Sequence, residues 1–143
     1  MNWHRVLQDH LLTLHPASAH ALDDTALQLL TTTLPEGLVS KPGETPAQPC
    51  KLALGIEVCG ELGTSEAQRL ISQTRLYIAS RIVLAERPDS ALDEHAFRAL
   101  GFTVLAVDGP NNMNLYEYDL DTYKTVPDWL NARYWAHPER WKP

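Results

Sequence analysis

Two glutamates, Glu57 and Glu61, stand where an acid could take part in chemistry. Glu57 lies near the end of the apolar run KLALGIEV, and Glu61 follows just beyond it. If the run is a strand of a parallel sheet, both carboxylates reach the carboxyl edge, where open α/β sheets bind ligands. They are our candidate catalytic or substrate-contacting acids. In the structural alternative, Glu57 only caps or solvates a strand end and Glu61 lies on a surface turn beside Gly60 and Gly63.

Histidines and cysteines are the usual ligands of a protein-bound metal. Four histidines recur at intervals of five or six in the N-terminal segment: His4, His10, His15 and His20. A pair sharing one helix face would need a spacing of three or four. We therefore predict surface and edge positions for them and no metal site. Cys50 and Cys59 are nine positions apart, and we expect two reduced, packed thiols rather than a disulfide.

Three signatures of enzyme chemistry do not occur in the sequence. They are the GxSxG nucleophile elbow, the GxxxxGK[ST] phosphate loop and the CxxC redox pair. The segment DGPNNMN, from Asp108 to Asn114, is rich in turn-forming residues. It either contacts a ligand or makes a tight connection between strands, and we favour the connection.

An aromatic tail, residues 121–143, is the other conspicuous feature. Its candidate interaction residues are Trp129, Arg133, Tyr134, Trp135 and Trp141. Tryptophan and arginine are enriched at interface hot spots, so a protein partner or a homodimer is one interpretation. The other is that the tail clamps onto its own core, as large aromatics in small domains do. Base stacking would use the same residues but would need surrounding positive charge.

The composition narrows the classes of function. The chain has 143 residues, 44% of them hydrophobic and 21% charged, which suits one globular domain over 1–143. A net charge of −6 without a basic cluster argues against nucleic acid. The sequence shows no apolar run long enough to cross a bilayer and no secretory leader, so we expect no membrane contact and a cytoplasmic location.

The elements that must position these residues alternate along the chain. Apolar spacing predicts a first helix over residues 2–15, ended by Pro16, and a short strand at SAHAL before a helix at DDTALQLLTTTL. Prolines between 35 and 49 leave at most a brief strand at GLVSK. The later strands are KLALGIEV, RIVLAE, FTVLAV and NLYEYDL, with helices at TSEAQRLISQTRLYIAS and before Gly101. This order predicts a three-layer α/β domain with a mostly parallel sheet, whose alternating last strand is an exposed antiparallel edge.

The run LALGIEVCGELGTSEAQRLISQTRLYIASRIVLAERP resembles the fourth strand, helix and fifth strand of class I S-adenosylmethionine-dependent methyltransferases. FRALGF resembles their next helix-to-strand junction, and NLYEYDL their final antiparallel strand. The resemblance covers residues 51 to 120 and implies a Rossmann-like sheet. The tail YKTVPDWLNARYWAHPERW is also similar to that of a little-characterised family of short bacterial proteins.

In active members of the methyltransferase class, a glycine-rich turn after the first strand lets the backbone approach the cofactor, and an acid after the second strand binds its ribose. Here no glycine occurs between Met1 and Leu34, and only Glu36 or Glu44 could supply that acid. We therefore expect a fold truncated in its N-terminal half, with a degenerate cofactor site that binds no cofactor. The predicted function is a non-catalytic binding or interaction module. The alternatives are a methyltransferase with an atypical site, and a structural subunit that packs through its aromatic tail.

Overall fold

The computed structural model describes residues 2–35, 37–44, 46, 48–60, 62–90 and 92–120. Helices and strands alternate as the sequence predicts. In chain order they are α1 (Trp3–Leu14), β1 (Ser18–Ala21), α2 (Asp24–Thr33), β2 (Leu38–Ser40), β3 (Leu52–Ile56), α3 (Thr64–Gln73), the π-helical turn η1 (Thr74–Ile78), β4 (Arg81–Glu86), α4 (Glu94–Ala99), β5 (Thr103–Asp108) and β6 (Met113–Asp119). None of the helices in these ranges is long and apolar enough to cross a membrane.

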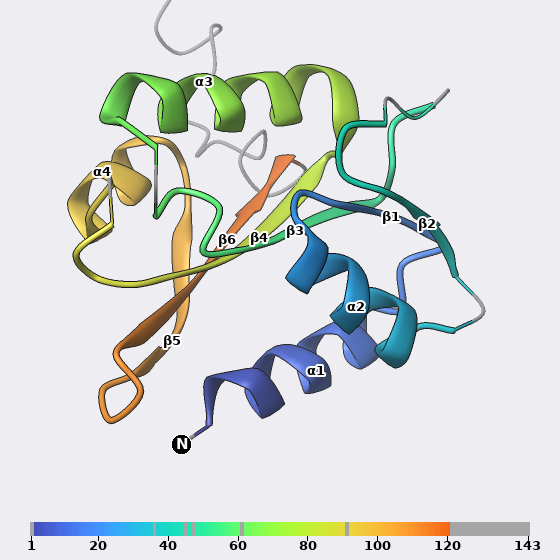
Figure 1. Cartoon of the computed structure of the whole chain (residues 1–143), viewed down its shortest axis with the longest axis horizontal. Coiled ribbons are helices and arrows are strands. Elements are labelled where there is room, and N and C mark those ends of the chain that lie inside the picture. Colours follow the sequence, from blue (N-terminus) through green and yellow to red (C-terminus); the bar gives the residue numbers. More distant parts are fainter. Residues whose placement is uncertain are drawn as a thin grey trace, which may run out of the picture.

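The strands form one sheet in the order β2-β1-β3-β4-β6-β5. The pairs β2–β1, β1–β3 and β3–β4 are parallel, and β6 is antiparallel to both β4 and β5. Helices cover both faces, with α1 and α2 on one and α3 and α4 on the other (Figure 1). The predicted three-layer, mostly parallel α/β fold is confirmed. β2 is one edge strand of the sheet. Between β2 and β3 the described residues form only an isolated bridge, Cys50 with Ala79.

The antiparallel strand β6 differs from the expectation in its position. It lies between β4 and β5 rather than at the edge, and β5 is outermost. Tyr116 and Tyr118, expected on a more exposed strand, are 0% and 3% exposed. Tyr116 stacks on Phe97 of α4, with ring centroids 4.2 Å apart. Burying two large aromatic rings favours an interior position for this strand.

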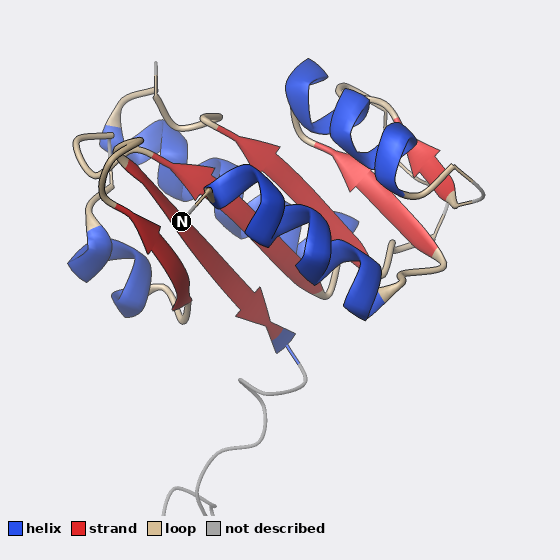
Figure 2. Ribbon diagram, turned by 90° about the horizontal axis from the view of Figure 1, so that it is seen from below, coloured by secondary structure: helices blue, strands red, loops and turns tan. Residues whose placement is uncertain are grey.

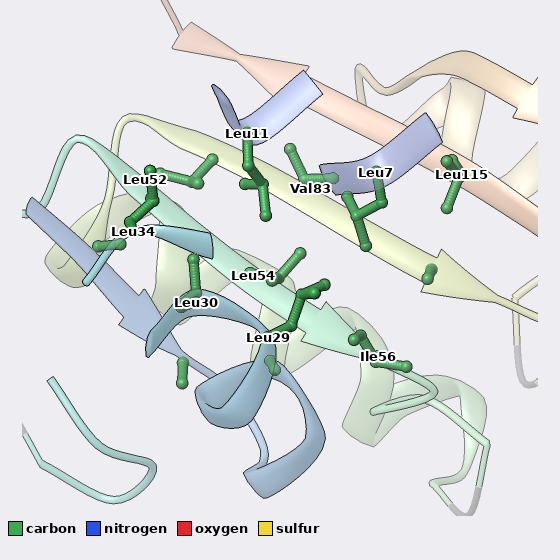
Figure 3. Packing of buried hydrophobic residues seen from close by; sticks show 14 of the residues in the cluster. Leu7, Leu11, Leu29, Leu30, Leu34, Leu52, Leu54, Ile56, Val83 and Leu115 are labelled. Atoms are coloured by element: carbon green, nitrogen blue, oxygen red, sulfur yellow. The ribbon is translucent and has the colours of Figure 1, made fainter. Parts of the chain in front are cut away.

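The face covered by α1 and α2 carries one of the two cores (Figures 2 and 3). The Asn2 side chain caps α1 by accepting from the amide of His4, and His15, which follows the last helical residue Leu14, lies in the left-handed region before Pro16. Leu7 and Leu11 are fully buried, as the spacing predicts. They pack beside strand residues that include Leu54 and Val83. The first helix predicted from the apolar spacing is confirmed.

The face covered by α3 and α4 carries the second core, which includes Ile71, Phe97 and Leu92. α3 begins at Thr64, after Gly63, with no side-chain cap, so Ser65 and Gln68 lie inside the helix and do not form a capping box at its start. Asp93 caps α4 by accepting from the amide of Ala96 at 2.8 Å. Gly101 follows α4 with φ of +97°, the predicted left-handed stop.

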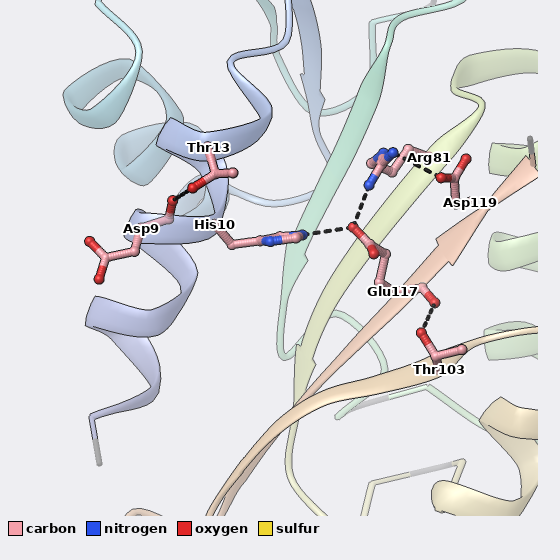
Figure 4. Close-up of polar contacts among 7 residues, drawn as sticks. All are labelled: Asp9, His10, Thr13, Arg81, Thr103, Glu117 and Asp119. Carbon is pink, nitrogen blue, oxygen red and sulfur yellow. Dashed lines mark hydrogen bonds and ion pairs between the residues drawn. The ribbon is translucent and has the colours of Figure 1, made fainter. Parts of the chain in front are cut away.

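A polar network joins α1 to the sheet (Figure 4). His10 Nε2 lies 2.7 Å from Glu117 Oε2 of β6, and Arg81 Nη1 of β4 lies 2.8 Å from the same oxygen. Arg81 Nη2 also donates to Asp119 Oδ2 at 2.8 Å. Burial disfavours the Glu117 carboxylate, but the hydrogen bonds and positive charge supplied by His10 and Arg81 prevail and lower its pKa. These contacts let β6 carry acids on a face that α1 covers.

Candidate functional site

The carboxyl ends of β1, β3 and β4 meet at one edge of the sheet. The chain turns in opposite directions from β1 and β3, since β2 lies on one side and β4 on the other. Ligands of open α/β sheets bind at such a change of direction. An open pocket of about 820 Å³ lies there, lined by Leu22, Asp23, Glu57, Val58, Gly60, Leu62, Leu70, Glu86, Arg87, Asp89 and Ser90. This pocket is the candidate site.

Glu57 is the predicted site residue that the structure places in this pocket. Its backbone lies in the left-handed region, with φ of +59°, and its amide donates to the carbonyl of Ala85 at 2.7 Å. Its Oε1 accepts from Arg87 Nε at 2.8 Å, in an ion pair in which both side chains are nearly half exposed. Left-handed backbone is unfavourable for a non-glycine residue. Such strain is often found at functional sites.

Two other sets of predicted site residues cannot be placed. Glu61 lies outside the described residues, although its neighbours Gly60 and Leu62 line the pocket. The aromatic tail residues Trp129, Arg133, Tyr134, Trp135 and Trp141 also lie outside the described residues. Their roles remain predictions.

Glu86 is a site residue that sequence reasoning missed. It ends β4, lines the pocket and is 0% exposed. Its Oε2 accepts from the amide of Cys59 at 3.2 Å, while its Oε1 has no hydrogen-bond partner among the described residues. Burial raises the pKa of Glu86 to about 7, although the hydrogen bonds from Cys59 act in the opposite direction. The available signal was an acid that ends the apolar run RIVLAE.

The two cysteines are free, buried thiols, as expected. Burial, together with the nearby Glu86 carboxylate, raises the pKa of Cys59 to about 12. The nucleophilic form of cysteine is the thiolate. Cys59 therefore stays protonated at neutral pH and contributes packing and a backbone donor rather than a nucleophile.

Asp23 closes the turn between β1 and α2. Its Oδ1 accepts from the amide of Ala26 at 3.3 Å, which caps α2, and from the amide of Ile56 at 3.1 Å, which joins the turn to the end of β3. Burial raises the pKa of Asp23, and these amides partly offset that effect. The sequence predicted an acid at the start of this helix but not its bond to β3.

The turn between β1 and α2 corresponds to the glycine-rich turn that approaches the cofactor in the methyltransferase class. Only Leu22 and Asp23 separate β1 from α2, and both carry a β-carbon where the class has glycine. Ser40 ends β2, and its Oγ lies 2.7 Å from Nδ1 of the buried His20. Of the two predicted acids, Glu44 accepts from the amide of Lys41, and Glu36 lies outside the described residues. These residues do not fit the cofactor cradle.

The N-terminal histidines are spread over different environments. His4 and His15 are exposed, and His10 contacts Glu117. His20 is 2% exposed, which corrects the expectation of a surface or edge residue. Within the described ranges no three His, Cys, Asp or Glu side chains are grouped closely enough to hold a metal ion. The loop of Asp108 to Asn114 makes the β5–β6 connection, in which the Asp108 carboxylate accepts from Asn111.

Solved methyltransferase structures resemble this chain. Magnesium protoporphyrin IX methyltransferase (ChlM) from Synechocystis PCC 6803, with bound S-adenosylmethionine, has a TM-score of 0.53 and 12% sequence identity, covering 80% of this chain and 76% of that chain. A putative methyltransferase from Pseudomonas syringae has a TM-score of 0.49 and 16% identity, covering 82% of this chain and 99% of that chain. The similarity to ChlM shows a methyltransferase-like, Rossmann-like fold, and fold alone does not carry function.

The two sequence comparisons gave different results. No curated protein matches the chain. Over residues 1–143, the chain belongs to the family of unknown function DUF6231.

Proposed function

We propose that this protein is a non-catalytic, cytoplasmic binding module that keeps a methyltransferase-like fold and works without S-adenosylmethionine. The observation that carries the proposal is the position of the Asp23 carboxylate. It lies within hydrogen-bond distance of the amides of Ala26 and Ile56, across the gap between the ends of β1 and β3. A cofactor approaching this turn would have to displace the helix cap.

The chemistry of the turn also supports the proposal. A glycine-rich turn leaves backbone amides free to approach a ligand and allows positive φ. Here the Asp23 side chain accepts hydrogen bonds from one backbone amide of α2 and one of β3, and Leu22 adds a branched side chain. What stays open is the pocket that this turn lines together with the ends of β3 and β4. Binding at that pocket needs no cofactor.

A titration of the full chain with S-adenosylmethionine tests the proposal. A ligand present at 100 times its dissociation constant adds roughly 2.7 kcal/mol of stability, which corresponds to a shift of several degrees in Tm for a domain of this size. We expect no shift at millimolar ligand. A shift accompanied by chemical-shift changes in the amides of Leu22 to Thr25 would overturn the proposal.

The alternative is a methyltransferase with an atypical cofactor site. The fold similarity favours it, and Glu57, which lines the pocket, or Glu61 would then lie near the transferred group. The same titration separates the two functions, because only the enzyme requires S-adenosylmethionine. An enzyme would also lose methyl transfer on Glu57→Gln while still binding the cofactor.

The aromatic tail supplies the proposed contact with a protein partner or a second copy of the chain. Its tryptophans and arginine are residue types that anchor interfaces. Replacing Trp129 and Trp135 with alanine is expected to abolish association in a sedimentation experiment while the chain remains folded. An unfolded variant would instead show that the tail packs on its own core.

A further inference from the structure

We propose that the pocket at the carboxyl ends of β1, β3 and β4 binds a small organic cation, an ammonium or guanidinium group carried on an apolar stem. The inference rests on the proposed function, because it assigns a ligand class to the site of that binding module. It follows from the charge of the lining, one unmet acceptor and the spacing of the acids.

The described lining of the pocket is strongly acidic. It contains four acids, Asp23, Glu57, Glu86 and Asp89, and one basic residue, Arg87. Arg87 pairs with Glu57, and Asp23 accepts from two backbone amides. The carboxylates of Glu86 and Asp89 have no cationic partner in the pocket lining. A cleft lined by one sign of charge attracts a ligand of the opposite sign.

Glu86 is the independent sign of a ligand. Its side chain is fully buried, it lines the pocket, and its Oε1 lacks a hydrogen-bond partner among the described residues. An unpaired buried acceptor is costly, and native proteins satisfy nearly all of them. An N–H donor at the inner end of the pocket would supply the missing partner. A positive donor would also offset the repulsion between Glu86 and Glu57.

The spacing of the acids selects an organic cation over a metal ion. No three acidic, histidine or cysteine side chains in the described ranges converge closely enough to ligate a metal. The rest of the lining includes the apolar side chains of Leu22, Val58, Leu62 and Leu70. Most ligand sites combine such an apolar wall with a few polar groups that set orientation. A charged head and a short apolar stem match both parts of this lining.

Binding of a cation at Glu86 should be linked to proton release. Cys59 and Glu57, which follow β3, are the titratable groups that act on Glu86, and Glu86 in turn acts on Tyr116 of β6. Cys59 and Tyr116 both have raised pKa values and stay neutral at pH 7. Glu86, with a pKa of about 7, ionises in this range. Affinity for a cation should therefore rise with pH through neutrality.

The test is an NMR titration of the full, isotope-labelled chain with n-butylamine, matched against 1-butanol and butyrate, which share its stem. We expect roughly millimolar affinity for the amine. Its shifts should centre on the amides of Cys59, Leu62, Arg87 and Ser90, while the neutral and anionic analogues bind at least about tenfold more weakly. Between about pH 6 and pH 8 the amine affinity should rise about tenfold, because Glu86 becomes ionised.

Two variants test whether amine binding and its pH dependence come from Glu86. Glu86→Gln should weaken amine binding about tenfold and remove its pH dependence. Glu94→Gln removes the same charge from an exposed helix position paired with Arg98 and should leave binding within about twofold of the parent. If Glu86→Gln does not fold, the pH dependence of the unmodified chain decides alone.

Three outcomes overturn the inference. They are equal binding of the amine and its analogues, shifts that map away from the pocket, and a localised response to Mg²⁺ or Ca²⁺ but not to the amine. Failure of the proposed function is distinguishable from these. S-adenosylmethionine bound as a cofactor would shift the amides of Leu22 to Thr25 and would keep its affinity in Glu86→Gln.

Discussion

The carboxylate of Asp23 accepts a hydrogen bond at 3.1 Å from the amide of Ile56, 33 residues further along the chain. The same oxygen caps α2 at the amide of Ala26. One side chain thus fixes the start of a helix and the end of the neighbouring parallel strand. It also occupies the turn in which a methyltransferase would keep its glycines.

Replacing Asp23 with alanine should lower the free energy of unfolding by about 1–3 kcal/mol, because the helix cap and a partner of the Ile56 amide are lost together. Asp23→Asn is the matched control. Its amide oxygen can still accept both bonds, so it should cost less. Urea denaturation of the two variants measures the difference. An alanine variant within about 0.5 kcal/mol of the parent would show that these bonds contribute little.

Glycine at position 57 should be more stable than alanine by about 1 kcal/mol, because φ of +59° suits glycine and strains a residue with a β-carbon. Both variants lose the ion pair with Arg87, so their comparison isolates the backbone. At an ordinary strand position the order is reversed. Thermal melts of Glu57→Gly and Glu57→Ala test the prediction, and an equally or more stable alanine variant would contradict it.

Glu117→Gln should destabilise the protein by about 1–3 kcal/mol at pH 7, because Arg81 and His10 lose the carboxylate they share. The folded state lowers the pKa of Glu117 below its ordinary value of 4.5. Its contribution to stability is therefore present above pH 4.5 and lost as pH falls through the lowered pKa. The difference between parent and variant should shrink in acid.

Urea denaturation of both proteins across that pH range measures this effect. Glu94→Gln is the control, since the Glu94–Arg98 pair is half exposed and should contribute at most about 0.5 kcal/mol. A Glu117 variant no less stable than this control would mean that the network does not hold α1 to the sheet.

Glu86 should make the protein less stable as pH rises. Its pKa is raised from 4.5 to about 7, so the folded state holds a proton that the unfolded chain releases. The associated stability is present below pH 4.5 and is lost as pH rises through about 7, with a magnitude of about 3 kcal/mol. Glu86→Gln should lack this slope. Chemical denaturation of parent and variant at several pH values tests it, and parallel curves would contradict the prediction.

The location of the candidate site was predictable in part. The apolar run before Glu57 and its place in a parallel sheet led to the carboxyl edge, which is where the pocket lies. Glu86 was not found, because its burial depends on the loop after β3 folding over the end of β4. That packing is visible in the bond between Cys59 and Glu86 but not in the local pattern of either segment.

The sequence by itself determined which segments become helices and strands, and that most strands run parallel. Apolar periodicity, prolines and caps act over a few residues, so they are readable locally. Only the tertiary structure decided that β6 lies inside the sheet. Its alternation of tyrosines and acids suits an exposed edge, but α4 buries Tyr116 on one face, and His10 and Arg81 satisfy Glu117 on the other. Because those partners are distant in sequence, the free energy that places β6 belongs to the assembled fold.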